Sequence, residues 1–136
     1  MKVVICYFIL GLCFLIFGCT SSEYNKLYDD AEMAYLGDDV KKAEQELISF
    51  ENFLKRRLEN GPKEYLKSAL ILTNIRLFDV YSFLGEKENA ENRIDTANEL
   101  RIKFDDKDKE VITREVLNYF IQKVQHNDRN TPGWKK

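Results

Sequence analysis

Few residues of this 136-residue chain have a type and a spacing that suit chemistry, and the most informative of them is Cys19. It follows the small residue Gly18 at the end of an uncharged, largely apolar run that starts at Val3, directly behind the basic Lys2. A membrane-spanning helix needs roughly 20 apolar residues, and this run is shorter. A basic residue, a short apolar run and a small residue form the layout of a secretory signal peptide. The pattern predicts that residues 1–18 are removed and that Cys19 becomes the first residue.

The stretch Ile16-Phe17-Gly18-Cys19 resembles the bacterial lipoprotein signal, in which an aliphatic residue, a short residue and Gly or Ala precede a cysteine. Phe17 departs from that pattern because it is bulkier than the usual residue. The resemblance implies diacylglycerol on the Cys19 sulfur and an acyl chain on its new amino group, and Thr20 is compatible with sorting to the outer membrane. Two or more acyl chains give stable attachment to a bilayer. The alternatives are an uncleaved N-terminal anchor and an ordinary signal peptide.

The rest of the chain shows no catalytic constellation. His126 is the only histidine, and it stands near the end of a predicted helix with no partner at a fixed spacing, so we expect a solvated helix-end residue. Asp105, Asp106, Asp108 and Glu110 resemble a calcium loop only in charge, because the central Gly and the spaced Glu of an EF-hand are missing. The glycines stand singly and form no phosphate-binding loop. We therefore expect no enzymatic activity, no bound metal and no cofactor.

The charge balance argues against a nucleic-acid partner. The chain has 21 Lys and Arg against 23 Asp and Glu, and Lys2 lies in the predicted signal, so the processed chain has a net charge of about −3. A nucleic-acid-binding domain would present a basic face. Cys6 and Cys13 also lie in the predicted signal, and Cys19 would be acylated, so we expect neither a free thiol nor a disulfide. One small domain of about 117 residues must then be stabilised by packing alone.

Apolar residues recur at spacings of three and four along most of the chain after Cys19, which is typical of amphipathic helices. Gly37, Asn60-Gly61-Pro62 and Gly85 are the expected breaks, and the acidic pair Asp38-Asp39 is expected to cap the second helix. No segment alternates as a strand would. The sequence therefore predicts an all-α fold of five antiparallel helices at about 24–36, 40–58, 63–84, 87–104 and 109–125.

The predicted helix 63–84 is apolar almost all round, which indicates a helix covered on several sides. Its Arg76 and Asp79 are three positions apart, and we expect them to form a solvated ion pair on the one open edge. Glu51 and Lys55 of the preceding helix are assigned to a mixed, solvated face.

A repeated order of residues connects two of the predicted helix pairs. The second pair resembles the tetratricopeptide repeat, with large residues between helices, a glycine at the turn and small residues where helices approach; these are Leu77, Tyr81, Gly85, Ala90, Ile94 and Ala97. Asn74 and Phe78 depart from that pattern. The first pair repeats the spacing at Ala43, Leu47 and Phe50, about 47 residues earlier, whereas the standard repeat is roughly 34 residues long.

The resemblance predicts a tetratricopeptide-like array of two pairs plus a closing helix over residues 24–126. A tether at 19–23 would precede it, and a flexible tail at 127–136 would follow. Trp134 in that tail could dock on the domain, contact the membrane surface or remain disordered. The alternative to the array is any antiparallel helical bundle, because alanine is common at close-packed positions.

Tetratricopeptide-like arrays present a concave groove, lined mostly by the first helix of each pair, to a peptide or a partner helix. Here the resemblance gives six candidate partner-binding residues, for each of which plain solvated surface is the alternative. They are Asn25, Asp29, Glu32, Thr73, Arg76 and Tyr81.

The features above predict a lipid-anchored protein of the bacterial cell envelope, on the outer membrane and facing the periplasm. Its function would be that of a non-enzymatic adaptor or assembly factor for a protein or peptide partner. The alternative is a periplasmic immunity or inhibitor protein that binds a toxin or a lytic enzyme. An enzyme is the least supported hypothesis, because the sequence offers no nucleophile, base or cofactor motif.

Replacing Cys19 with alanine is expected to abolish acylation and therefore the mature, membrane-bound form. Mass spectrometry should find no acyl chains, and no protein of the mature size should partition into detergent. Cys13→Ala removes another cysteine of the apolar run and should leave both properties unchanged. Detergent partitioning of Cys19→Ala at the mature size would show that the lipid hypothesis is wrong.

Overall fold

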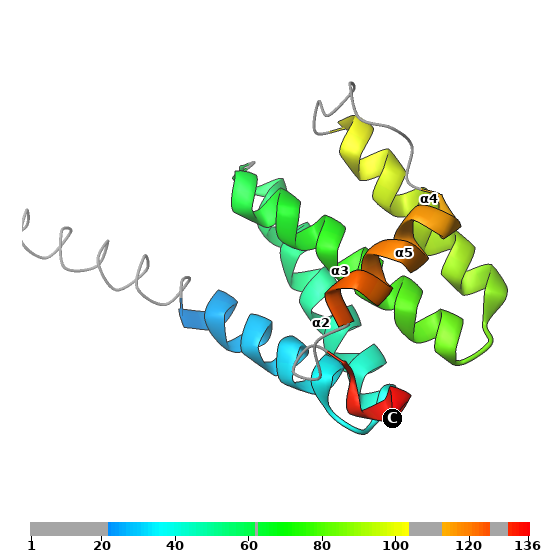
Figure 1. Ribbon diagram of the computed structural model, residues 1–136. Coiled ribbons are helices and arrows are strands. Elements are labelled where there is room, and N and C mark those ends of the chain that lie inside the picture. Colours follow the sequence, from blue (N-terminus) through cyan, green and yellow to red (C-terminus); the bar gives the residue numbers. More distant parts are fainter. Residues whose placement is uncertain (1–21, 62, 104–112, 126–130) are drawn as a thin grey trace, which may run out of the picture.

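The fold is all-α throughout the residues that the computed structural model describes, which are 22–61, 63–103, 113–125 and 131–136. Helical residues 22–36 come first and are followed by α2 (Val40–Glu59), α3 (Glu64–Phe83), α4 (Lys87–Lys103), α5 (Arg114–Gln125) and the short 3-10 helix η1 (Gly133–Lys135). The predicted all-α class is therefore confirmed (Figure 1). The predicted signal, Cys19, the acidic stretch 105–110 and His126 lie outside the described residues.

Local chemistry explains where several helices begin and end. The Asp39 carboxylate accepts hydrogen bonds of 3.0 Å from the backbone N–H groups of Lys41 and Lys42, which is the cap expected from the sequence. Gly85 adopts a φ of 75° in the turn between α3 and α4. A residue with a Cβ rarely adopts that conformation, which explains a glycine at this point.

Consecutive helices pack as antiparallel pairs. α2 packs on α3, and α3 packs on α4 (Figure 1). Helix 22–36 joins this stack through Tyr24, whose ring centroid lies 5.6 Å from that of Phe50 in α2. Ala43 and Ala90, which hold equivalent places in the two second helices of the predicted repeat, are both completely buried. Small side chains at these two positions allow close helix–helix approach.

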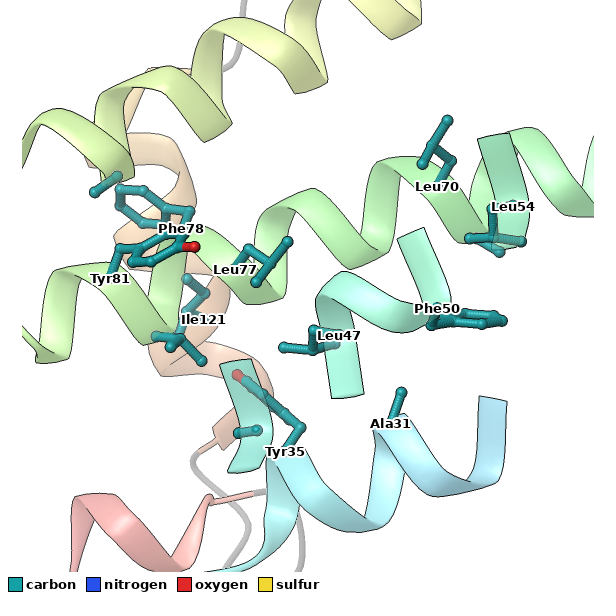
Figure 2. Packing of buried hydrophobic residues seen from close by; sticks show 14 of the residues in the cluster. Ala31, Tyr35, Leu47, Phe50, Leu54, Leu70, Leu77, Phe78, Tyr81 and Ile121 are labelled. Carbon is teal, nitrogen blue, oxygen red and sulfur yellow. The ribbon is translucent and has the colours of Figure 1, made fainter. Parts of the chain in front are cut away.

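A single apolar core joins all the helices, and α3 supplies its centre. Leu77, Phe78 and Val80 of α3 are completely buried. These residues point to different sides of the helix, so its C-terminal half is covered on several sides. Leu47 of α2 and Ile121 of α5 approach this part of α3 from different sides (Figure 2). The expectation of a helix covered on several sides is confirmed.

A buried polar cluster ties α2, α3 and α4 together. Glu51 of α2 is only 3% exposed, and both of its carboxylate oxygens lie 2.9 Å from Nη1 of Arg93 in α4. The same Nη1 donates to Oδ1 of Asn74 in α3 at 3.1 Å, and Asn74 donates its amide to the Leu70 carbonyl at 2.9 Å. The assignment of Glu51 to a solvated face was wrong, because α4 covers that side of α2 and supplies a cation there.

Truncating Leu47 to alanine should destabilise the domain strongly, because its completely buried side chain would leave a cavity in the core. We expect a loss of about 2–5 kcal/mol in the free energy of unfolding, measured by urea denaturation. Met33→Ala is the matched control, since that side chain is 66% exposed and should change stability by no more than about 0.5 kcal/mol. Equal effects of the two variants would contradict this core assignment.

Candidate functional site

The six predicted partner-binding residues do not form one open surface. Asn25 and Asp29 are exposed on helix 22–36. Glu32 and Arg76 are brought together as an ion pair with an Oε2–Nη2 distance of 2.5 Å, which links helix 22–36 to α3. Thr73 is buried and donates its hydroxyl to the Ala69 carbonyl at 2.8 Å.

Tyr81 is also buried, and its ring lies beneath the Arg93 guanidinium at 5.8 Å. Burial raises the pKa of the Tyr81 hydroxyl above its ordinary value. The placement of Thr73 and Tyr81 on a binding surface is therefore corrected, since both face the interior. They lie on the sides of α3 that neighbouring helices cover, which their position in the repeat could not reveal.

The expected Arg76–Asp79 surface pair is not formed either. Arg76 pairs with Glu32 and stacks on the ring of Tyr35 at 5.1 Å. Asp79 is only 5% exposed and accepts hydrogen bonds from the Tyr35 hydroxyl at 2.7 Å and from the Gln125 amide at 3.1 Å. Helix 22–36, α3 and α5 thus meet at one buried carboxylate.

The environment of Tyr35 favours its neutral form. Burial and the adjacent Asp79 carboxylate together raise the pKa of the Tyr35 hydroxyl far above its ordinary value. The neutral hydroxyl donates to Asp79 and also accepts from Gln125 at 2.9 Å. This arrangement holds a proton firmly in place, which suits a structural hydrogen bond.

The end of the chain docks on this cluster. Lys135 pairs with Asp79, and the Trp134 indole donates its N–H to the Tyr35 carbonyl at 2.9 Å. Trp134 is buried, and its ring lies 4.9 Å from that of Phe83 at the end of α3. The predicted flexible tail is therefore wrong for residues 131–136, because the indole and the ammonium find an apolar and an anionic partner on the domain.

This docking covers part of the surface where the groove was predicted. In Figure 1 the C terminus lies beside the turn after helix 22–36, and the Trp134 backbone N–H bonds the Gly37 carbonyl at 3.2 Å. The protein's own α5 and C-terminal segment therefore cover Tyr35 and Asp79, at the place where helix 22–36 meets α3.

An open cleft of about 660 Å³ lies at the other side of the helix stack. It forms where the C-terminal parts of α2 and α4 meet the N-terminal part of α3. We call it the lysine cleft, and its lining residues are Lys55, Leu58, Glu59, Lys67, Leu70, Leu100 and Lys103. Its volume falls within the range of about 300–1,000 Å³ that is typical of ligand pockets.

The lysine cleft combines an apolar floor with a mainly cationic rim. Leu70 is buried beneath it, and Leu58 and Leu100 are half-buried. Lys55 pairs with Glu51 at 2.9 Å and Lys67 pairs with Glu64 at 2.7 Å, so these ammonium groups are held by partners of their own helices. Such a surface suits a ligand that places apolar side chains on the leucines and a carboxylate near Lys103.

The sequence analysis missed this cleft for a simple reason. Its three lysines come from three helices and share no spacing, and its leucines resemble ordinary core residues. Only the excess of Lys and Arg between positions 55 and 67 gave a hint, with five cations against two glutamates.

A scan of the chain against models of protein families found no match, and searches of curated proteins and of solved structures found none either. Among the helices that the structure describes, none is both long enough and apolar enough to cross a bilayer. Within the same part of the chain, no group of three or more His, Cys, Asp or Glu side chains is placed to hold a metal ion.

Gly133→Ala should release the docked C-terminal segment. An added Cβ would lie 1.9 Å from Asp38 Oδ1 and 2.8 Å from the Gly37 carbonyl oxygen, and the backbone contact cannot be relieved by a rotamer change. Trp134 is the only tryptophan, so its fluorescence should shift to the red, and stability should fall by about 1–3 kcal/mol. Lys136→Ala, at an exposed position of the same segment, should change neither quantity. An unaltered emission spectrum of Gly133→Ala would contradict the docking.

Proposed function

We propose that this protein is a lipid-anchored adaptor of the bacterial cell envelope, held at the outer membrane through Cys19 and facing the periplasm. It would bind a protein or peptide partner without catalysing a reaction. The anchor follows from the signal-like run that ends at Gly18-Cys19. The adaptor function rests on the lysine cleft, because this concavity lies outside the face that the C-terminal segment covers.

The partner that suits the lysine cleft is an amphipathic, acidic segment, such as a helix with apolar residues on one face. Helices commonly bind other proteins by placing an apolar stripe in a groove, and the residues of that stripe recur at spacings of three and four. The leucine floor would receive that stripe, and Lys103 at the rim would face its carboxylates. Electrostatic attraction of this kind favours rapid and selective association more than high affinity.

The proposal keeps the tetratricopeptide-like interpretation of the fold as a hypothesis. Its support is that equivalent positions of the two helix pairs share the same environment, since Ala43 and Ala90, and also Leu47 and Ile94, are buried. Tetratricopeptide-like arrays act mostly as binding scaffolds, which agrees with an adaptor. In this protein α5 would close the array.

A charge reversal in the lysine cleft tests the adaptor function. The full-length protein would be purified from its own membranes after mild crosslinking, as wild type and as Lys67→Glu/Lys103→Glu. We expect the variant to recover its main partner about tenfold less, equivalent to about 1.4 kcal/mol, with the wild-type interaction weakening at high salt.

The matched control is Lys42→Glu/Lys87→Glu, which changes the net charge equally but alters lysines at the starts of α2 and α4. It should recover as much partner as the wild type. Equal recovery by both variants would rule out the lysine cleft as the binding surface. A toxin or lytic enzyme as the recovered protein would favour the inhibitor alternative over the adaptor.

A further inference from the structure

A cluster of aromatic rings lies where helix 22–36, the second half of α2 and the start of α3 come together. The Tyr24 ring is 5.3 Å from Tyr65 in an edge-on arrangement, 5.6 Å from Phe50 and 6.4 Å from Phe53. Tyr28 stacks on Tyr24 at 6.2 Å. We call these five residues the tyrosine face.

The tyrosine face is buried at its base and open at its rim. Phe50 and Phe53 belong to the core, whereas Tyr24 and Tyr28 are half-buried and Tyr65 is 52% exposed. Each rim residue carries a phenol hydroxyl on an apolar ring. Core packing accounts for the two phenylalanines but not for a large exposed tyrosine in the first turn of α3.

Covalent geometry places this face close to Cys19. Only four residues separate Cys19 from Tyr24, so five chain steps join them, and an extended chain covers at most about 3.6 Å per step. Whatever its conformation, this stretch therefore spans no more than about 18 Å. An acyl chain on Cys19 would keep Tyr24 within that distance of the bilayer surface.

We propose that the tyrosine face rests on the membrane surface when the protein is anchored. This inference rests on the lipidation in the proposed function and adds an orientation to it. Tyrosine is enriched at membrane–water interfaces, because its ring suits the apolar side and its hydroxyl suits the headgroups. Arg57 lies above the Phe53 ring at 5.6 Å, and exposed Lys63 comes just before α3. Two cations that can attract anionic headgroups therefore lie next to residues of the tyrosine face.

This orientation leaves the lysine cleft free for a partner. Successive residues of an α-helix are turned by about 100°, so on α3 Lys67 lies about 200° and Leu70 about 140° from Tyr65. Lys67 and Leu70 line the cleft. A domain that lies on its tyrosine face would therefore direct the cleft away from the bilayer.

Spin labels at single cysteines test the orientation in the full-length, lipidated protein. The variants are Tyr65→Cys and, as the matched control, Tyr119→Cys on α5, where the native side chain is 67% exposed. After removal of the signal, acylated Cys19 is the only native cysteine left, so each label is unique. The protein would be reconstituted in vesicles of phosphatidylethanolamine and phosphatidylglycerol, after mass spectrometry has checked for acyl chains on Cys19.

Collision with oxygen reports contact with lipid, and collision with a water-soluble nickel complex reports contact with water. We expect the oxygen-to-nickel ratio at position 65 to exceed that at position 119 by several-fold. A lipidated protein with equal ratios, or with position 65 shielded from both reagents by another protein surface, would overturn the orientation and leave the anchor intact. Absence of acyl chains on Cys19 would overturn the anchor and the orientation together.

Discussion

Enclosure of α3 is the constraint on which the other elements depend. Most of its C-terminal half is buried, and residues of helix 22–36, α2, α4 and α5 belong to the same core. A helix that is apolar almost all round cannot be stable alone in water, and its partners gain stability by shielding it. Two buried polar residues of α3, Asn74 and Asp79, then serve as fixed points for neighbouring helices, because a buried polar group without a hydrogen bond is costly.

Two buried carboxylates organise opposite sides of this helix. Glu51 is matched by Arg93 and joins α2, α3 and α4, whereas Asp79 is matched by Tyr35, Gln125 and Lys135. Loss of one partner from a buried ionic contact leaves an uncompensated charge, so such contacts specify which helices pair even where they add little net stability. The second cluster also fixes the end of the chain. Lys135 pairs with Asp79, and the preceding residue, Trp134, packs against Tyr35 and Phe83.

These contacts divide the surface of the domain into three parts. The C-terminal segment and α5 cover the face where helix 22–36 meets α3, and the lysine cleft stays open between the ends of α2, α3 and α4. By helical geometry, Tyr65 of the tyrosine face points away from the side of α3 that carries the cleft residues Lys67 and Leu70. An anchor at Cys19, a membrane-facing tyrosine face and an outward cleft would give an adaptor a defined orientation, with each of the three parts using a different kind of interaction.

The sequence by itself determined the number and approximate limits of the helices, the Asp39 cap, the glycine turn at position 85 and the enclosure of α3. It also supplied the signal-like junction at Cys19, to which the structure adds nothing. These properties follow from local spacing and residue type, which one helix reveals on its own. Only the tertiary structure decided that Glu51, Thr73, Asp79 and Tyr81 are buried, that residues 131–136 dock and that three distant lysines share a cleft. Each of these outcomes depends on which neighbour covers a given side of a helix. The periodicity of a sequence cannot show which neighbour this is. It distinguishes apolar from polar faces of a helix, but it does not reveal a polar face that is covered by an opposite charge from another part of the chain.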